Sequence, residues 1–420
     1  MSEIIQKQDY KQTEVGLIPG DWDLFNLSNV LYSISDVDHY MPKTVKNGVP
    51  YVMTGDLRDF ASKIDFDGCK KITKKDYQKL SKKIKIAEGD IILARYATIG
   101  TVSFVNVNID FIVSYSCVTV KPYSSKLFGL LLNYYFKSNI FKLEVKSNVN
   151  ANIQENIGIG DLFKLRIPLP RKLTEQRAIA TALSDVDALL TSLEQLISKK
   201  QAIKQGAMQE LLTPPNQGGK RLPGFSGEWE EKNLESICYI SGGGTPSTAV
   251  LEYWNGEIEW FTPTEIGDQK YVFSSHRKIT RTGLKSSSAN LLPIGSILLT
   301  SRASIGDLAI LKKEASTNQG FQSLIPIRKE DSEFIYQLML TKKTDLMNLS
   351  SGSTFLEISP KKVRSLKILI PKDTIERETI AQILSEMDKE IKALEEKKDK
   401  YQKIKGGMMQ ELLTGKIRLV

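Results

Sequence analysis

Two segments of the chain place side chains that could contact DNA at the ends of predicted strands. Arg95 and Tyr96 follow one apolar run, and Ser301 and Arg302 follow another. Arginine can donate two hydrogen bonds to guanine, and arginine or tyrosine can bind a phosphate. These residue types at the end of a strand indicate contact with DNA.

Amide side chains gather in two polar segments that suit the same chemistry. Asn and Gln favour adenine, because one amide can form two hydrogen bonds with N6 and N7 of that base. For any single amide, a solvated loop residue is the alternative. The candidates are Asn150, Asn152 and Gln154 in the first half of the chain, and Asn318, Gln319 and Gln322 in the second.

A glycine-rich run with Gly243, Gly244 and Thr245 follows another predicted strand. Its backbone could cradle a phosphate, but no Gly-Lys-Ser/Thr follows as in a Walker A loop. Ser247 also stands where the dinucleotide-binding fingerprint needs its last glycine. We interpret this run as a turn close to a ligand or to the DNA backbone.

Residues for catalysis or metal binding are scarce. The two histidines, His39 and His276, lie far apart, and no Cys-x-x-Cys or His-x-x-x-His spacing adds ligands. We find no acidic pair followed by lysine, as in nucleases, and no Asn/Asp-Pro-Pro-aromatic stretch, as in DNA amino-methyltransferases. The sequence therefore predicts no catalytic residue, no metal site and no enzymatic activity of the chain itself.

The composition is that of an ordinary globular chain with a basic balance. The net charge is +9 in 420 residues and the pI is about 9.1, which favours a polyanionic partner. No apolar run approaches 18 residues and the first residues lack a secretory h-region, so we expect no membrane association. Three scattered cysteines suit a reducing compartment, and we expect a cytoplasmic protein.

Two long helices must position these candidates. Residues 170–213 and 371–414 align without a gap, and 20 of the 44 positions are identical. Each copy repeats apolar residues at steps of three and four, which predicts a seam between paired helices. A helix from Thr174 to Leu212 would be roughly 58 Å long. Asp373 and Glu376 have capping-box spacing. The seam residues are Leu183, Val186, Leu190, Leu193 and Ile197 in the first copy, and Leu384, Met387, Ile391 and Leu394 in the second.

The regions before each helix also match, more weakly, so a globular domain plus a helix is duplicated. Both are mixed α/β regions with short strands, and we expect one helix over Leu127 to Leu143. The matching positions are mostly Gly, Pro and apolar residues, whereas the segments between them differ. The predicted plan is an N-terminal arm (1–16), a first domain (17–169), a first helix (170–213), a linker (214–220), a second domain (221–370), a second helix (371–414) and a tail (415–420).

This arrangement resembles the specificity subunit of type I restriction–modification systems. The resemblance covers the whole chain and rests on the domain–helix duplication, on the Met-Gln-Glu-Leu-Leu-Thr ends of both helices, and on motifs of the second domain. Ser114-Tyr115-Ser116-Cys117 departs from the pattern, since the second domain has Asn-Gln-Gly-Phe there. The motifs are Gly243–Ser247, Tyr253–Gly256, Ile258–Trp260, Leu299–Gly306 and Thr317–Phe321.

The resemblance implies a fold, a function and partners. The fold is α+β, with two α/β target-recognition domains separated by two long helices that form an antiparallel coiled coil, and with pseudo-two-fold internal duplication. Each domain would read one half of a bipartite, asymmetric site in double-stranded DNA. The helices would set the gap between the half-sites and dock two methyltransferase subunits, which restriction subunits join. S-adenosylmethionine, ATP and Mg would bind to those partners, and no cofactor to this chain.

Three other readings remain open at this point. The chain could be an orphan DNA-binding adaptor without these partners. It could be a nuclease or methyltransferase with an unrecognised site, in which case the purified chain would cut or modify DNA. It could also be a coiled-coil tether without a DNA role, which leaves the two differing domains unexplained.

Overall fold

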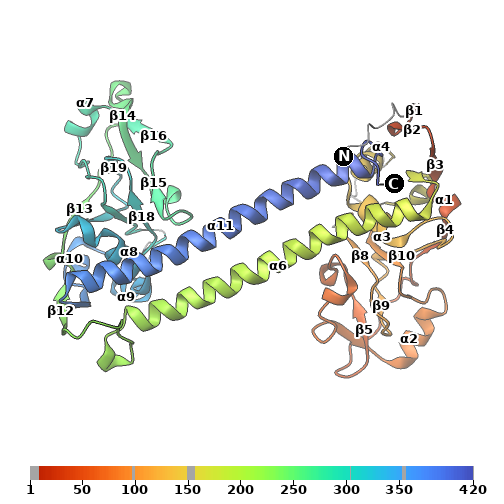
Figure 1. Cartoon of the computed structure of the whole chain (residues 1–420), viewed down its shortest axis with the longest axis horizontal. Coiled ribbons are helices and arrows are strands. Elements are labelled where there is room, and N and C mark those ends of the chain that lie inside the picture. The colour runs from red at the N-terminus through yellow and green to blue at the C-terminus, as the bar shows by residue number, and fades with distance from the viewer. Residues whose placement is uncertain (1–8, 97–99, 149–156, 303, 352–355, 420) are drawn as a thin grey trace. The chain divides into compact units, whose positions relative to one another are not determined.

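The computed structural model describes residues 9–96, 100–148, 157–302, 304–351 and 356–419. The chain divides into two compact units (Figure 1). The first unit combines Met1–Glu194 with Lys397–Val420, and the second is Gln195–Glu396. Each unit therefore contains part of both long helices, and each is described by itself below.

The first unit holds one globular domain and parts of the helices α6 and α11. Its strands are β1 (Tyr10–Thr13), β2 (Gly16–Pro19), β3 (Trp22–Asn26), β4 (Leu31–Ser35), β5 (Val49–Val52), β6 (Lys70–Ile72), β7 (Ile91–Ala94), β8 (Val102–Phe104), β9 (Ile112–Val113), β10 (Cys117–Pro122) and β11 (Arg166–Pro170). Its helices are α1 (Leu27–Val30), α2 (Lys74–Ser81), α3 (Gly129–Lys137), α4 (Asn139–Asn148), α5 (Ile159–Lys164) and the first part of α6 (Leu173–Leu211).

The second unit holds the other globular domain. Its strands are β12 (Trp229–Asn233), β13 (Cys238–Gly242), β14 (Trp254–Phe261), β15 (Tyr271–Val272), β16 (Arg277–Ile279), β17 (Ile297–Leu299), β18 (Leu308–Leu311), β19 (Ala315–Thr317), β20 (Gln322–Pro326) and β21 (Lys367–Pro371). Its helices are α7 (Arg281–Lys285), α8 (Ser332–Thr341), α9 (Lys343–Leu349), α10 (Pro360–Arg364) and the first part of α11 (Thr374–Leu412).

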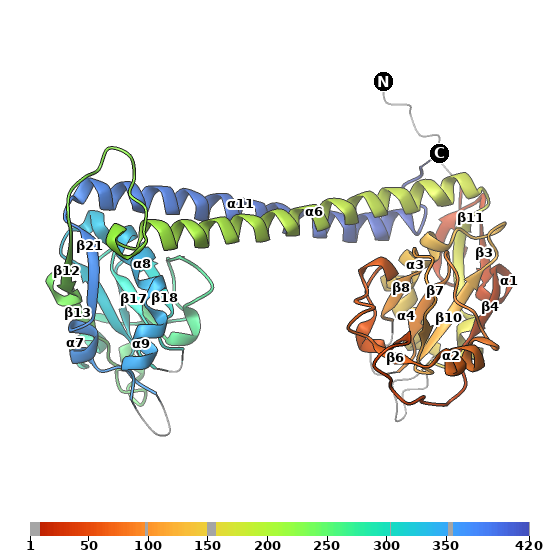
Figure 2. The same cartoon turned by 90° about the horizontal axis from the view of Figure 1, so that it is seen from below.

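The two units share one sheet topology, as the repeat in the sequence predicts. The order β4-β10-β7-β8 in the first unit corresponds to β13-β20-β17-β18 in the second, where β15 extends the sheet. The three-stranded sheets β6-β5-β9 and β16-β14-β19 also correspond, each with one antiparallel and one parallel pairing. Figure 2 shows β8, β7, β10 and β4 side by side in the first unit.

Each unit has a large core next to the long helices and a smaller one away from them. In the first unit the large core joins the β4-β10-β7-β8 sheet to α3 and to Leu183, Leu412 and Leu413 from the long helices. In the second unit it joins the equivalent sheet to α8 and to Leu212 and Leu384. Burying these side chains stabilises each domain together with the helix ends, since each buried leucine contributes about 1.5–3 kcal/mol.

The long helices run in opposite directions within each unit. In the first unit Lys405 pairs with Asp187 at 2.6 Å, and Lys398 pairs with Glu194 at 3.2 Å. In the second unit Lys200 pairs with Glu390 at 2.6 Å, and Lys204 pairs with Asp388. Among the predicted seam residues, Leu183, Leu190, Leu193, Ile197 and Leu384 are buried, whereas Val186, Met387, Ile391 and Leu394 are half-buried.

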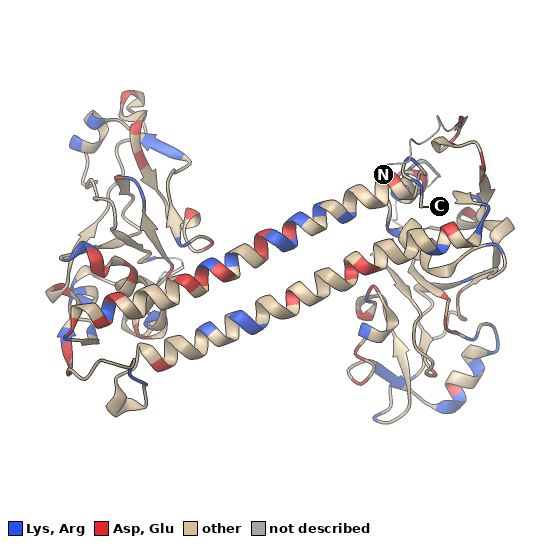
Figure 3. Cartoon of the chain, viewed as in Figure 1, with Lys and Arg blue, Asp and Glu red and all other residues tan. Residues whose placement is uncertain are grey.

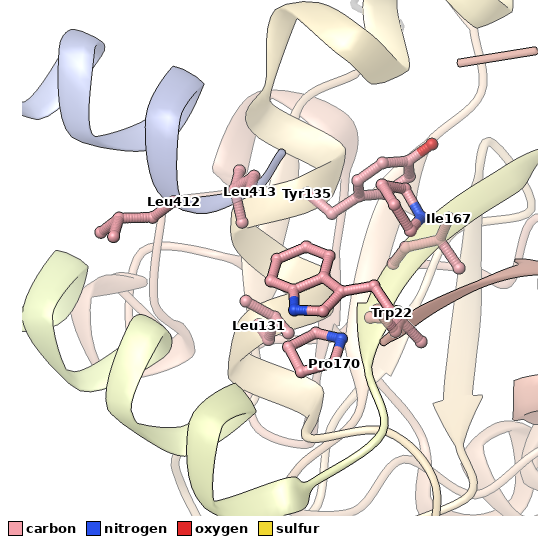
Figure 4. Close-up of a pocket in the computed structure, with 9 residues that line it drawn as sticks. Trp22, Leu131, Tyr135, Ile167, Pro170, Leu412 and Leu413 are labelled. Carbon is pink, nitrogen blue, oxygen red and sulfur yellow. The ribbon is translucent and has the colours of Figure 1, made fainter. Parts of the chain in front are cut away.

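The C-terminal end of α11 docks into the first unit. Leu412 and Leu413 lie with Trp22 and Pro170 around a small apolar cavity of about 10 Å³ (Figure 4). Gly415 follows in the left-handed region, with φ of 72°, and a Cβ atom there would lie 2.5 Å from Cγ of Pro19. Only glycine fits this turn, because both the backbone angle and the close approach exclude a side chain.

The arginine that follows each long helix forms an ion pair with a buried glutamate in the first turn of the other long helix. Arg418 donates to Glu175, with 2.8 Å between Nη2 and Oε2, and to Asp21. Arg221 donates to Glu376 in the second unit, also through two hydrogen bonds. Such bidentate pairs are geometrically specific. The two units thus contain the same contact between an arginine after one long helix and a glutamate at the start of the other.

Several predicted boundaries need correction. Residues 10–13 form β1 and pair with β2, so they are not a free arm. Residues 415–419 are held by Arg418 and by packing, so they are not a free tail. The helix predicted over 127–143 is broken at Ser138 into α3 and α4. Glu376 binds Arg221, whereas Asp373 accepts from the amide of Ile375 at 2.8 Å, so the predicted capping box is not formed.

Candidate nucleic-acid interface

The glycine-rich run of the second unit lies tightly against neighbouring segments. A Cβ atom at Gly243 would lie 2.0 Å from the carbonyl oxygen of Asn318, and one at Gly244 would lie 2.4 Å from the backbone nitrogen of Ala289. The amide of Gly244 donates to the carbonyl of Thr317 at 2.9 Å. These glycines are therefore needed for packing, and they bring residue 245 beside the segment after β19.

Polar side chains from that segment and the glycine-rich run meet at one edge. The hydroxyl of Thr245 donates to Oε1 of Gln319 at 2.6 Å, and both side chains are exposed. Oδ1 of Asn318 accepts a hydrogen bond from the amide of Gly320 at 2.8 Å. The NH2 group of Asn318 is therefore the part of the side chain that can donate to a ligand. Hydroxyl and amide groups of this kind can contact base edges or phosphates.

The segment after β17 joins the same edge. The amide of Ser301 donates to the carbonyl of Gly320 at 2.8 Å, and the amide of Ile358 donates to the carbonyl of Ser301 at 3.1 Å. Arg302 is half-exposed and pairs with Glu357, with 2.8 Å between Nε and Oε1. The structure therefore brings together Thr245, Arg302, Asn318 and Gln319, which come from three separate stretches and lie up to 74 residues apart along the chain.

Two predicted site residues of the second unit lie inside the domain. Ser301 is fully buried, and its hydroxyl has no hydrogen-bond partner among the described residues. Gln322 is 6 % exposed and lies in β20 opposite Gly242 of β13. The structure therefore places both side chains away from the exposed edge, and their contact with DNA stays a prediction.

A second sheet supports the glycine-rich run. Trp260 of β14 donates from its indole nitrogen to the carbonyl of Gly244 at 2.9 Å. The Arg277 guanidinium lies 3.7 Å from the ring centre of Trp254, which contacts Trp260 edge-on. Burial raises the pKa of Glu259, but hydrogen bonds from Lys313, Ser275 and Lys278 outweigh it and lower that pKa to about 2. The aromatic pair thus holds the run, because Trp254 also donates from its indole nitrogen to the carbonyl of Ser247 at 3.1 Å.

In the first unit, the equivalent edge has different side chains. Arg95 is only 6 % exposed and donates from Nη2 to Oδ2 of Asp36 at 3.0 Å. Lys83 pairs with the same carboxylate at 2.7 Å. Asp36 stands where the second unit has Gly243, 207 positions later. The structure therefore places Arg95 in the interior with its charge paired, and its contact with DNA stays a prediction.

Exposed or half-exposed aromatic side chains replace the amides at this edge. Tyr96 is half-exposed and lies beneath the guanidinium of Arg95, 5.2 Å from its ring centre. His39 stacks on Tyr115, with ring centres 4.9 Å apart. Tyr115 stands at the place of Gln319. The predicted amides Asn150, Asn152 and Gln154 lie outside the described residues.

The backbone that carries these different side chains is the same in both units. The amide of Arg95 donates to the carbonyl of Ser116 at 3.0 Å, as the amide of Ser301 does to Gly320. The amide of Ile157 donates to the carbonyl of Arg95 at 3.4 Å, as Ile358 does to Ser301. One hydrogen-bonded frame therefore presents two different surfaces.

Basic residues concentrate beside this edge in the first unit. Figure 3 shows lysines along β6 and α2, where the exposed ones are Lys70, Lys74, Lys75 and Lys79, and the exposed Lys82 and Lys83 follow α2. Such a group can track a phosphate backbone without reading its sequence. In the second unit the basic strand β16 carries Arg277 and Lys278.

Sequence reasoning missed Asp36 and Glu357, the acidic partners of Arg95 and Arg302. Aligning the two halves offers a signal for Asp36, because a carboxylate replaces a glycine that packing requires in the other copy. Glu357 gives no such signal. Within the described ranges, no three His, Cys, Asp or Glu side chains gather as a metal site would need, and no helix is apolar enough over the length of a bilayer crossing.

Comparison with known proteins agrees with this organisation. A model of the type I restriction modification DNA specificity domain matches twice, at residues 19–205 and 226–404. The MjaIX specificity subunit of a type I restriction enzyme from Methanocaldococcus jannaschii is 38 % identical over 181 residues, 42 % of each chain. A putative MjaX specificity subunit from the same organism is 28 % identical over 99 % of this chain and 98 % of its own.

A solved structure has the same fold. The S subunit of a type I restriction-modification system from M. genitalium aligns with a TM-score of 0.60 at 17 % identity, over 93 % of this chain and 96 % of its own. The double match of the family model covers most of the chain. The chain therefore belongs to the family of type I restriction–modification specificity subunits.

Proposed function

We propose that this chain selects the DNA sequence on which a type I restriction–modification complex acts, and that each unit reads one half of a bipartite, asymmetric site. The observation that carries the proposal is the shared backbone frame with different side chains at its edge. A domain duplicated for two different DNA targets must keep the frame and vary the contacts. The basic balance of the chain supports a phosphate-bearing partner.

The edge of the second unit has the groups that base reading requires. Thr245 and Gln319 offer a hydroxyl and an amide, and Arg302 offers guanidinium donors that Glu357 holds in one orientation. Amide and guanidinium groups distinguish adenine and guanine in the major groove. In the first unit, Tyr96 and the stacked pair of His39 and Tyr115 would make the contacts, with flanking lysines on phosphates.

The long helices form an antiparallel coiled coil in this proposal, and their length sets the unread gap between the half-sites. The opposed ion pairs within each unit support that reading. The two helices also keep identical residues on one outer face, all exposed except the half-buried Gly206: Lys199, Ile203 and Gly206 in α6 and Lys400, Ile404 and Gly407 in α11. Identical exposed faces suit two copies of one partner, a methyltransferase subunit.

The glycines of this face support a close approach of that partner. No atom would lie within 4 Å of a Cβ atom at Gly206 or Gly407, so packing within the chain does not require glycine there. A helix-interior glycine costs about 1 kcal/mol relative to alanine. We expect Gly206→Ala with Gly407→Ala to raise the free energy of unfolding of the free chain and to weaken methyltransferase binding. Unchanged binding would contradict the close approach.

The partners carry the chemistry in this proposal. Two methyltransferase subunits would bring S-adenosylmethionine, and restriction subunits would bring ATP and Mg. This chain would bind no cofactor and would be non-catalytic, and the separation of reading from chemistry fits an edge built from amides, hydroxyls and aromatic rings.

Methylation mapping tests the function directly. The chain is co-expressed with the methyltransferase subunit of its own system, and methylated adenines are mapped across the host genome. We expect one bipartite motif with an unspecified gap. A folded complex that adds no methylation would refute the role in a modification enzyme and favour an orphan DNA-binding adaptor. Cutting or methylation by the purified chain alone would favour the enzyme alternative.

A further inference from the structure

Two tyrosines at equivalent positions are the feature that DNA reading leaves unexplained. Tyr32 of β4 is 70 % exposed, and Tyr239 of β13 is 66 % exposed. They are 207 positions apart, the same offset as between Trp22 and Trp229 at the start of each domain. An exposed tyrosine gains nothing from burial within its own domain, yet both copies retain it.

Each tyrosine has an exposed apolar residue nearby, at the position directly after the adjacent strand. In the first unit this is Tyr123, whose ring centre lies 5.9 Å from that of Tyr32 in an edge-on contact. In the second unit Ile327 takes the same place and is half-exposed. The amide of Tyr123 donates to Val30, and that of Ile327 donates to Ile237, both at 2.9 Å. The two pairs therefore sit on the same backbone frame.

A basic side chain borders each pair. Nζ of Lys126 lies 5.4 Å from the ring centre of Tyr123. Arg328 follows Ile327 and pairs with Glu378 at 2.7 Å, and its side chain is 36 % exposed. A partner that fits both places would present an apolar side chain to the exposed tyrosine and its neighbour.

These pairs lie at the far end of the strand from the candidate DNA edge. Ser116, which binds the backbone of Arg95, precedes β10, whereas Tyr123 follows it. Seven residues of extended strand cover about 23 Å. Gly320 and Ile327 bracket β20 in the second unit over the same number of residues. A duplex held at the DNA edge does not account for the tyrosines.

We propose that Tyr32 with Tyr123, and Tyr239 with Ile327, form two copies of one docking surface, each occupied by one copy of the same protein subunit. Surfaces that read different half-sites have diverged, while this surface keeps its exposed tyrosine and its backbone frame in both units. Tyrosine is also enriched among the residues that dominate protein interfaces. The inference rests on the proposed function, since the subunit present in two copies is the methyltransferase.

Stoichiometry by native mass spectrometry tests the proposal on the co-purified complex. The variants are Tyr32→Ser, Tyr239→Ser and the double variant, all at exposed positions where a polar residue is tolerated. The wild-type chain should carry two methyltransferase subunits. Each single variant should weaken one of the two binding events by about 10- to 100-fold, the range of an interface hot spot. The double variant should weaken both.

A matched control is Phe273→Ser. Phe273 is exposed like the tyrosines but follows β15, which extends only the sheet of the second unit. It should leave both binding events unchanged. If the wild-type chain binds no methyltransferase, the proposed function fails. If it binds two and the double variant still binds two with equal affinity, the docking surface is refuted while the function stands.

Two further readouts exclude other occupants. A changed methylation motif in Tyr32→Ser with intact stoichiometry would assign the surface to DNA and overturn the proposal. Self-association of the free wild-type chain that the double variant abolishes, again with two methyltransferase subunits retained, would assign it to a second copy of this chain. Light scattering on the free chain measures that outcome.

Discussion

Arg95 and Ser301 occupy the same place in the two units, but only Arg95 brings a charge into the interior. Asp36 compensates that charge, and it can do so because the first unit has a carboxylate where the second needs a glycine. The substitution of one small residue by a charged one thus changes which side chains remain available at the edge. In the second unit Arg302, one position later, keeps its guanidinium half-exposed.

The pair of Arg95 and Asp36 leads to a stability prediction. Asp36→Ala leaves a buried guanidinium without its partner, so we expect a loss of about 3–5 kcal/mol from the stability of the first unit. Hydrogen exchange of β7 and β10 measures it locally. The control is Asp23→Ala, which removes the exposed pair with Arg171 and should cost at most about 1 kcal/mol. Equal effects of the two variants would show that Arg95 does not depend on Asp36.

Glu259 leads to a pH prediction. Its pKa in the folded chain, about 2, lies below the ordinary value of 4.5, so its ionised form stabilises the fold above about pH 4.5. That contribution is lost as the pH falls from 4.5 through 2. We expect Glu259→Gln to cost about 1–2 kcal/mol at pH 7, since exposed lysines are partly screened, and less at pH 3. Urea unfolding at both pH values measures it, and a constant difference would contradict the pairing.

A single aspartate connects the elements of the second unit. Asp388 of α11 accepts hydrogen bonds from Gln337 of α8 at 2.7 Å and from Lys270 at 3.0 Å, and it pairs with Lys204 of α6. Burial raises the pKa of Asp388, but Lys204 and Lys270 outweigh it and hold that pKa below its ordinary value. Asp187 has the same place in the first unit, where Tyr134 and Lys405 bind it. Each aspartate holds its domain to both long helices at once.

Removing the contacts of Asp388 should weaken the packing of α6 against the second unit. Asp388→Asn leaves Lys204 largely buried without its counter-charge, while Lys270 keeps Glu333, so we expect a loss of about 2–4 kcal/mol and faster hydrogen exchange over residues 195–211. Glu390→Gln, on the same helix, removes the partly exposed pair with Lys200 and should have little effect. If exchange is unchanged in Asp388→Asn, apolar packing alone holds α6 to the second unit.

The whole molecule repeats one plan twice, and the repeat leads to a prediction of modular specificity. Replacing residues 221–370 with the equivalent domain of a relative keeps the ion pair of Arg418 with Glu175. It changes the side chains at the edge around Thr245 and Gln319. We expect one half of the methylated motif to change while the other half and the gap stay the same. Methylation mapping of the chimaera measures it. A change in both halves would contradict independent reading.

The repeat, the long helices and the family resemblance follow from the sequence by itself. These features depend on local periodicity, on helix-end signals and on matching motifs, which are visible along one stretch of chain. The different roles of equivalent positions follow only from the tertiary structure. Ser301 and Gln322 have polar side chains suited to DNA, but strand pairing buries both.

Contacts between residues far apart in the chain determined which charged side chains are paired. Arg418 meets Glu175 across 243 positions, and Arg95 meets Asp36 across 59, so neither pair has a spacing that a sequence pattern could reveal. Residues 415–419 are held for the same reason, because the partners of Arg418 lie far away in the chain. Periodicity reports the neighbours of a residue within one element, whereas burial and charge pairing depend on which elements the fold brings together.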